Sequence, residues 1–203
     1  NNYSSNLLYV PVASILRYKS AEYWNRFSYA PQVVDGIYYD VMNETEVAVT
    51  FKDRHYNSYR GEVEVPAQVE IEGRTYRVTA VSDYAFYNCD SLISVVLPNA
   101  IDSIGQYAFY DCDALTSVTF ENTNGWNYTD NSKYTNGTEI DVTDEEQNAI
   151  NLTDRYKKYY WYSKPAAPSD RHGGLLPSNH TSLRHSCRSY DFRDGIRHAL
   201  SGP

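Results

Sequence analysis

The sequence predicts a β-rich repeat fold: a short right-handed stack of parallel strands, joined by turns or short helices and closed by irregular caps. Three observations support this fold class. A 23-residue unit occurs twice in succession, apolar residues alternate along short segments, and several of these segments end in proline. The composition agrees, because 21 tyrosines against one methionine favour thin aromatic and β-branched layers over a thick aliphatic core.

The repeat is the strongest of these observations. Residues 78–100 (VTAVSDYAFYNCDSLISVVLPNA) align without a gap on residues 101–123 (IDSIGQYAFYDCDALTSVTFENT), with 10 identities in 23 positions. Both copies then read L-x-x-V-x-[L/F], which is the strand signature of a leucine-rich repeat. The sequence therefore predicts two leucine-rich repeats over 78–123, in a leucine-rich-repeat solenoid.

Equivalent residues of the two copies are expected to stack on each other in the same layer of the fold. The last two apolar residues of the signature lie two positions apart and share one face of a strand, so their neighbours point to the other face. On that other face we expect Ser94, Val96, Ser117 and Thr119 to be displayed together. The expected buried layer is Phe86, Cys89, Leu92, Val95 and Leu97 in the first copy, with Phe109, Cys112, Leu115, Val118 and Phe120 in the second. Ala85, Ala108, Val81 and Ile104 complete this wall.

Residues 33–77 are expected to form a β-rich entry cap. Proline ends a strand pattern at Pro11, Pro66 and Pro98, because it has no backbone N–H to donate. Aligning Val65 with Leu97 makes EVEVP an irregular further copy, followed by the insertion AQVEIEGRTYR. We expect this insertion to be a hairpin with an Ile-Glu-Gly-Arg turn.

Residues 124–163 are expected to form the C-terminal cap. The density of Gly, Asn, Asp and Thr after Glu121 predicts turns. The stretch TDEEQNAINL predicts a short helix with Thr143 as N-cap and Glu146 completing a capping box. We expect Ala149, Ile150 and Leu152 to share one face of that helix. The aromatic run YKKYYWYS (156–163) predicts a final strand or a flap over the last rung.

These residues resemble a known family. The pattern AFYNCDSLISVVLPNAIDSIGQYAFYDCDALTSV is similar to the BspA-like, or Treponema-type, leucine-rich repeat of bacterial surface proteins, specifically over 78–120 and more loosely over 33–77. The opening LLYVPVASILRYKSAEYWNRF resembles the closing element of such an array, a strand and Pro followed by a short helix, so 1–32 is expected to be that element and a linker. Family members usually carry many repeats, and the resemblance implies a monomeric module of a longer chain.

The resemblance also implies a function. We expect a non-catalytic, extracellular or cell-surface module that binds a protein or glycan of a host or neighbouring cell, without a cofactor; the alternative is a structural spacer. The candidate binding surface combines the four outward residues with Trp126 and Tyr128. Aromatic rings at Tyr87, Tyr110, Trp126, Tyr128, Tyr156, Tyr159, Tyr160 and Trp161 either contact a ligand or seal the core. Sealing is the favoured interpretation, since caps must cover apolar edges.

Charge and hydropathy argue against nucleic acid as a partner and against a membrane span. The net charge is −8, with an excess of acidic residues in 1–163 and of basic residues in 164–203. An acidic body repels phosphate backbones, which argues against nucleic acid. No run of 18 apolar residues is present, so no segment predicts a membrane span.

Catalytic and metal-binding patterns are weak. Cys89 and Cys112 are expected to be buried thiols, with their oxidation state left open, and the body offers only His55 as a base. The tail 164–203 has no clear period and is expected to be disordered. Its His172, His180, His185, Cys187 and His198 match no zinc spacing, and the acidic runs DCD and DEE lack a calcium-loop pattern.

Overall fold

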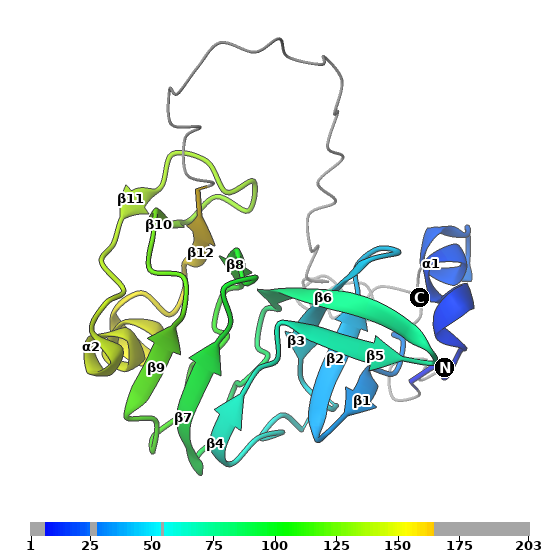
Figure 1. Ribbon diagram of the computed structural model, residues 1–203, viewed down its shortest axis with the longest axis horizontal. Coiled ribbons are helices and arrows are strands. Elements are labelled where there is room, and N and C mark those ends of the chain that lie inside the picture. Colours follow the sequence, from blue (N-terminus) through cyan, green and yellow to red (C-terminus); the bar gives the residue numbers. More distant parts are fainter. Residues whose placement is uncertain (1–6, 25–27, 54, 165–203) are drawn as a thin grey trace, which may run out of the picture.

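The protein is described by a computed structural model over residues 7–24, 28–53 and 55–164, in which most strands belong to two sheets (Figure 1). The smaller sheet is parallel and has the order β4 (Gly61–Glu64), β7 (Leu92–Leu97), β9 (Ser117–Phe120). The larger sheet has the order β1 (Gln32–Val34), β2 (Ile37–Val41), β3 (Glu46–Thr50), β6 (Arg74–Val81), β8 (Ser103–Ile104), β12 (Tyr160–Ser163), β10 (Trp126–Thr129), β11 (Thr138–Glu139). Strand β5 (Gln68–Ile71) pairs with β6 beside this path.

The chain alternates between the two sheets as it advances from β3 to β4, β6, β7, β8 and β9. In the smaller sheet Ser94 lies beside Ser117. In the larger sheet Val81 lies beside Ile104. Both pairs are parallel neighbours 23 residues apart. The 23-residue unit of the sequence is therefore one rung of the structure, as predicted.

Strand β4 adds a third rung to the smaller sheet. Val63 pairs with Val95, and the Val65 N–H donates to the Val96 carbonyl at 3.0 Å. This register confirms the alignment of Val65 with Leu97. The longer interval in this rung is taken up by the β5–β6 hairpin, whose turn residues Glu72 and Gly73 have φ of 50° and 75°. Two consecutive positive φ angles are typical of a type I′ turn, so the predicted hairpin is confirmed.

Strand β6 runs through residues 77 and 78, where the sequence had suggested a boundary between the entry cap and the first repeat. The same strand pairs with the hairpin strand β5 and with the repeat strand β8. The entry cap and the repeats thus share one continuous strand.

A column of aromatic rings forms the centre of the core. Phe86 stacks on Phe109 with ring centroids 4.7 Å apart and planes inclined by 12°, and Tyr59 lies 4.6 Å from Phe86 on the opposite side. Tyr59 thereby takes the place of the phenylalanine in the first rung. The predicted buried layer is confirmed at Phe86, Cys89, Leu92, Val95, Leu97, Phe109, Cys112, Val118 and Phe120. Leu115 is only partly buried, because it lies in the last rung and no later rung follows among the described residues.

The N-terminal side is closed by helix α1 (Val12–Ser20) and the β1–β2 hairpin. Val12 and Ile15 are the buried residues of α1, and the Lys19 ammonium contacts the Asp40 carboxylate of β2 at 2.5 Å. The strand expected before Pro11 is reduced to an isolated bridge between Leu8 and Tyr29. The predicted helix is confirmed.

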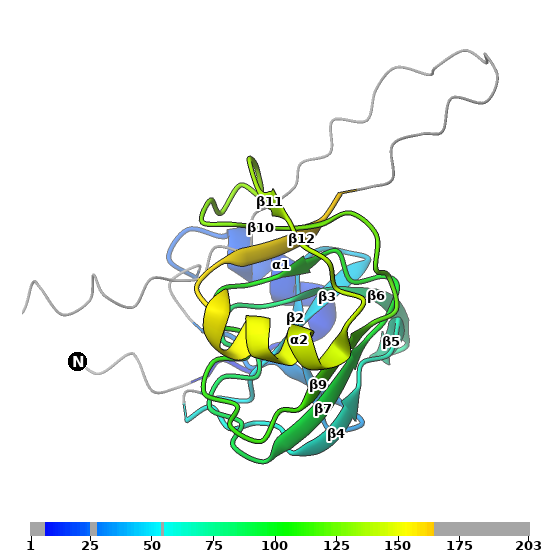
Figure 2. The same ribbon diagram turned by 90° about the vertical axis from the view of Figure 1, so that its left-hand side faces the viewer.

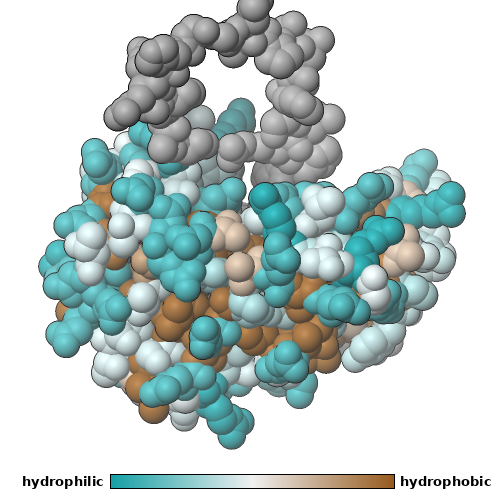
Figure 3. Space-filling view, viewed as in Figure 1, coloured by the Kyte–Doolittle hydropathy of each residue, from teal (hydrophilic) through white to brown (hydrophobic). Residues whose placement is uncertain are grey.

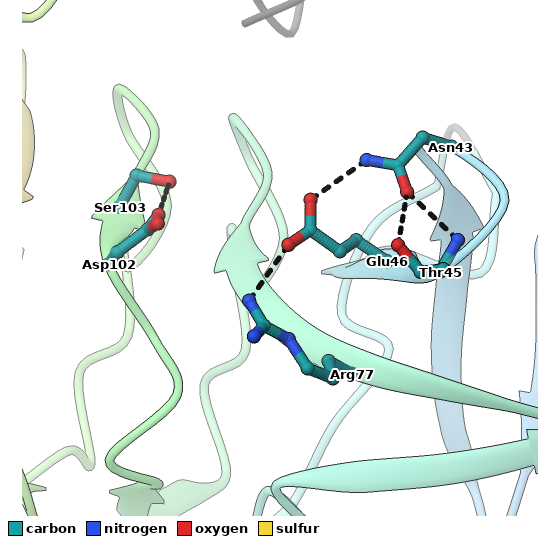
Figure 4. A network of polar contacts seen from close by, with 6 residues as sticks. All are labelled: Asn43, Thr45, Glu46, Arg77, Asp102 and Ser103. Atoms are coloured by element: carbon teal, nitrogen blue, oxygen red, sulfur yellow. Dashed lines mark hydrogen bonds and ion pairs between the residues drawn. The ribbon is translucent and has the colours of Figure 1, made fainter. Parts of the chain in front are cut away.

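Polar contacts connect β3 to β6 near this end, and a separate pair lies at the start of β8 (Figure 4). The Glu46 carboxylate accepts from Arg77 of β6 at 2.9 Å and from the Asn43 amide at 2.8 Å. At the start of β8 the Ser103 hydroxyl donates to Asp102 at 3.0 Å. The Glu46–Arg77 pair is partly exposed, so it contributes about 0–1 kcal/mol and mainly supports the register of β3 on β6.

The C-terminal side is closed by β12, β10 and helix α2 (Glu145–Ile150), which continues as a π-helix, η2 (Asn151–Arg155). Figure 2 shows α2 lying across the end of the stack. The buried Asn148 amide donates to the carbonyls of Val118 on β9 and of Val142, both at 2.9 Å. One side-chain amide thus ties the helix to the last strand of the smaller sheet.

Two details of the predicted cap helix are wrong. The N-cap is Asp144, whose carboxylate accepts from the Gln147 N–H at 2.9 Å, whereas Thr143 bonds to Asp141. The helix therefore begins one residue later than predicted, at Glu145. Ile150 is 50% exposed while Ala149 and Leu152 are buried, because residues three apart share a helix face and the residue next to Ala149 does not.

The predicted β-rich fold with parallel repeat strands is confirmed, but the larger sheet is mixed. Strands β3, β6 and β8 are parallel, whereas β2 and β12 flank them in antiparallel orientation. At the N-terminal end, short turns return the chain as the β1–β2 and β2–β3 hairpins. At the C-terminal end, β12 returns beside β8 from a distant segment, after α2 and η2. The tail 165–203 lies outside the described residues.

We predict that Gly105→Ala destabilises the fold by about 3 kcal/mol, because a Cβ at Gly105 would lie 2.7 Å from the Cα of Asp83, within its backbone contact distance. Urea unfolding monitored by circular dichroism measures this change. Ser82→Ala, one rung earlier at the equivalent position, is the matched control and should change the free energy of unfolding little. Equal stability of the two variants would contradict the prediction.

We predict that Tyr59→Phe costs about 1–3 kcal/mol, because the Tyr59 hydroxyl donates to the Thr50 carbonyl at 2.5 Å and accepts from the Tyr38 N–H at 3.1 Å. Burial raises the pKa of Tyr59 above its ordinary value of 10.0. A raised folded-state pKa means that the hydroxyl contributes fully below pH 10.0 and progressively less above it. The stability gap between wild type and variant should therefore narrow in alkaline buffer.

Candidate functional site

The candidate site is the outer face of the three-stranded sheet formed by β4, β7 and β9. The strand register places Glu62, Ser94 and Ser117 in one row and Glu64, Val96 and Thr119 in the next. The intervening row, Val63, Val95 and Val118, turns inward to the core. The four residues predicted on β7 and β9 are therefore brought together as two adjacent pairs.

This face is flat and chemically simple. Ser94, Val96, Ser117 and Thr119 are half-buried, while Glu62 and Glu64 are exposed. Ile93, at 47% exposure, adds a large apolar side chain beside these rows. In Figure 3 hydrophobic atoms gather around β7 and β4, interrupted by hydrophilic ones. Small hydroxyls and apolar side chains on rigid strands favour contact with a complementary surface over the enclosure of a small molecule.

Glu62 and Glu64 belong to the outer face, but the initial site prediction did not include them. The signal was present in EVEVP, because the alignment of Val65 with Leu97 makes Glu62 equivalent to Ser94 and Glu64 equivalent to Val96. The two carboxylates give one edge of the face a negative charge that β7 and β9 lack.

Trp126 cannot be part of an exposed binding surface, which corrects the prediction. Its side chain is 1% exposed, its ring packs against Phe120 at 4.8 Å, and its indole N–H donates to the Asn122 carbonyl at 2.7 Å. Trp161 is equally buried. Tyr128 is half-buried and stacks on Tyr156 at 4.2 Å. These contacts support the interpretation that the C-terminal aromatic rings seal the core.

The doubled word YAFY also produces a tyrosine ladder, which we define as Tyr56, Tyr84, Tyr87, Tyr107 and Tyr110. Tyr84 stacks on Tyr107 with centroids 5.5 Å apart and planes inclined by 12°, and Tyr87 contacts Tyr110 at 5.6 Å. Tyr56 lies 4.8 Å from Tyr87 at one end, and the Lys157 ammonium lies 4.6 Å from the Tyr110 ring at the other. The stacked rings cover each other's faces, so fewer faces are free to stack on a sugar.

His55 is the one histidine among the described residues, and it lies in an exposed polar turn. The His55 side chain is 95% exposed, and its partner is Asp53 at 3.0 Å. The His55 backbone N–H lowers the pKa of Asp53, as expected for a carboxylate in a polar turn. No group of three or more His, Cys, Asp or Glu side chains in this part of the chain could hold a metal ion. The histidines of the tail and Cys187 lie outside the described residues.

Cys89 and Cys112 are neighbouring buried free thiols, as predicted. The Cys112 sulfur contacts the Phe86 carbonyl at 2.9 Å. The hydrogen bond with Cys89, followed by burial, raises the pKa of Cys112, while the same bond lowers that of Cys89. Both thiols are closed to solvent, so they fill space in the turn and offer no accessible nucleophile.

Comparison with known families decides what this architecture is. Residues 69–153 match the family described as "BspA type Leucine rich repeat region". This segment of the chain is therefore similar to BspA-type leucine-rich repeats. The match begins inside the β5–β6 hairpin and continues through the cap helix, so it contains both 23-residue repeats. No curated protein matches the chain.

Several solved structures are similar to part of this chain. A leucine-rich cell surface protein from Faecalibacterium prausnitzii A2-165 is 25% identical, with a TM-score of 0.40 over 47% of this chain and 24% of that one. A leucine-rich repeat protein from Bacteroides ovatus is 26% identical, with a TM-score of 0.38 over 43% of this chain and 22% of that one. The leucine-rich repeat protein of T. pallidum is 27% identical, with a TM-score of 0.34 over 44% and 38%. The chain thus spans well under half the length of each of these proteins.

None of the helices in the described ranges is long and apolar enough to cross a membrane.

We predict that Cys89 and Cys112 resist alkylation while the protein is folded, because both side chains are buried. In a Cys187→Ser variant, Cys89 and Cys112 are the only cysteines. This variant should take up no iodoacetamide at pH 8 when folded and two equivalents in denaturant. Mass spectrometry counts the adducts. Rapid labelling of Cys89 in native buffer would show an accessible thiol and contradict the prediction.

Proposed function

We propose that this BspA-type repeat region is a non-catalytic, protein-binding module of a bacterial surface or secreted protein. In this proposal its rungs form a short right-handed solenoid, and the outer face of β4, β7 and β9 contacts the partner. The observation that carries the proposal is the alignment of six non-framework residues in two rows on one rigid sheet.

The variable positions support this choice of face. Phe86 and Phe109, which repeat between the copies, are buried and cannot discriminate a ligand. On the outer face Ser94 and Ser117 are the same residue, whereas Val96 of one rung lies beside Thr119 of the next. Specific recognition in a repeat protein needs such differences, because the framework side chains only stack the rungs.

A protein partner is supported more strongly than a glycan. Sugar recognition commonly uses an exposed aromatic face, but the outer face has no aromatic side chain, and the rings of the tyrosine ladder pack on one another. The strip of Ser, Thr and Val side chains instead resembles the mixed polar and apolar character of ordinary protein interfaces.

The test measures binding of the full chain to two arrays, one of immobilised extracellular and cell-surface proteins and one of glycans. We predict saturable binding to a member of the protein array and a loss of at least about tenfold in Ser94→Arg/Ser117→Arg/Thr119→Arg, because three bulky cations would stand between the two surfaces. The matched control Gln32→Arg/Gln68→Arg/Thr75→Arg adds the same charge around the β5–β6 hairpin and β1.

Equal loss in both triple variants would show that only charge matters and would contradict a specific outer face. Binding to glycans alone, with the outer-face variant unaffected, would refute the proposal. A structural spacer, the second candidate, predicts no saturable binding and tolerance of both sets of substitutions. Circular dichroism and urea unfolding of each variant establish that the fold is retained.

A further inference from the structure

The two edges of the three-stranded sheet differ in what lies against them. Strand β9 forms one edge, and helix α2 covers it through the Asn148 bond to the Val118 carbonyl. Strand β4 forms the other edge, and it pairs with no strand on its outer side among the described residues. The smaller sheet is therefore closed at one edge and open at the other.

The open edge presents unpaired main-chain groups. The N–H groups of Gly61 and Val65 donate to the Ser91 and Val96 carbonyls, at 2.7 and 3.0 Å, toward β7. Successive residues of a strand direct their N–H and C=O alternately to its two sides, so Glu62 and Glu64 direct theirs away from β7. These four groups are a template for one additional strand.

A groove runs beside this edge. It encloses about 280 Å³ between the β1–β2 turn (residues 35–37), the loop at 58–60 and β4 itself (62–64). Ile37 and Tyr59, both buried, contribute apolar atoms to it, and Val63 of β4 is only partly buried. The open main chain therefore adjoins a partly apolar recess with room for side chains.

The charge around the groove is negative on three sides. Glu62 and Glu64 are exposed on β4, and Asp35 lies in the β1–β2 turn, opposed by the single cation Arg60. None of the three carboxylates makes an ion pair with another described residue. A cationic strand would place its side chains beside them, whereas two β4 edges brought together would oppose like charges.

We propose that the β4 edge binds an extended peptide strand of a partner protein in which basic and β-branched apolar residues alternate. The peptide main chain pairs with Glu62 and Glu64, as in other cases of strand addition. Its lysine or arginine side chains lie on the outer side next to the two carboxylates, and its apolar side chains enter the groove beside Val63. This site shares Glu62 and Glu64 with the outer face, but it does not use the outer residues of β7 and β9.

The probe is the capped peptide Lys-Val-Lys-Val-Lys-Val-Lys, titrated into the full chain by isothermal calorimetry. Binding of one peptide per chain is expected. Glu62→Lys/Glu64→Lys should weaken it by about tenfold or more, because two favourable cross-strand pairs become repulsive. Glu44→Lys/Asp130→Lys is the matched control, with the same change in charge at two exposed residues away from β4.

Two peptide derivatives separate strand pairing from simple charge attraction. N-methylation of the lysine amides and N-methylation of the valine amides block opposite sides of the same strand, so one derivative should lose binding and the other retain it. Glu64→Pro removes an edge N–H of β4 without touching a bond to β7, and should also reduce binding while circular dichroism stays unchanged.

No measurable binding would overturn the proposal, as would equal affinity of both methylated peptides or equal weakening by the control variant. Concentration-dependent dimerisation through β4, lost in Glu64→Pro, would also overturn it by assigning the edge to a second copy. The variant Ser117→Arg/Thr119→Arg changes the outer face only on β9, leaves the direct neighbours of Glu62 and Glu64 intact, and should still bind peptide. The edge site and the outer face can therefore fail independently.

Discussion

Everything in this structure depends on the stacking of one rung on the next. A single rung is too thin to enclose its own apolar side chains, so Phe86 needs Phe109 on one side and Tyr59 on the other. The same contact fixes the spacing of the chain, since parallel partners must return every 23 residues to the same layer. The backbone bond from the Phe86 N–H to the Ala108 carbonyl, at 2.7 Å, maintains that register through the turns.

A stack of this kind leaves two apolar ends, and the protein closes them differently. At the C-terminal end, β12 turns antiparallel to β8, α2 lies over β9, and Trp126 and Trp161 fill the space beneath. At the N-terminal end, the β1–β2 hairpin extends the larger sheet, but no described strand covers β4 of the smaller one. The asymmetry concentrates unsatisfied main-chain groups and negative charge at one place.

The division between framework and variable residues also separates stability from recognition. The apolar residues shared by the two copies form the packed layers, and the paired cysteines belong to them, with their sulfurs close to main-chain carbonyls. The tyrosines of the two YAFY segments also contribute to packing, because the rings of equivalent residues contact each other along the turns. The outer face and the β4 edge, which we propose as binding surfaces, lie outside this packed framework.

The sequence by itself determined the length of each rung and which of its residues face the core. Its 23-residue period, the inward alternation at Val95 and Leu97, the Ile-Glu-Gly-Arg turn and the alignment of Val65 all follow from local spacing and turn chemistry. Tertiary structure alone decided which aromatic residues are exposed: Trp126 reads as a surface residue in a polar loop, yet packing against Phe120 buries it. Tertiary structure also decided the partial exposure of Leu115, the mixed larger sheet and the open edge at β4. These depend on which element covers each end of the stack, and that is a contact between distant segments which no local pattern encodes.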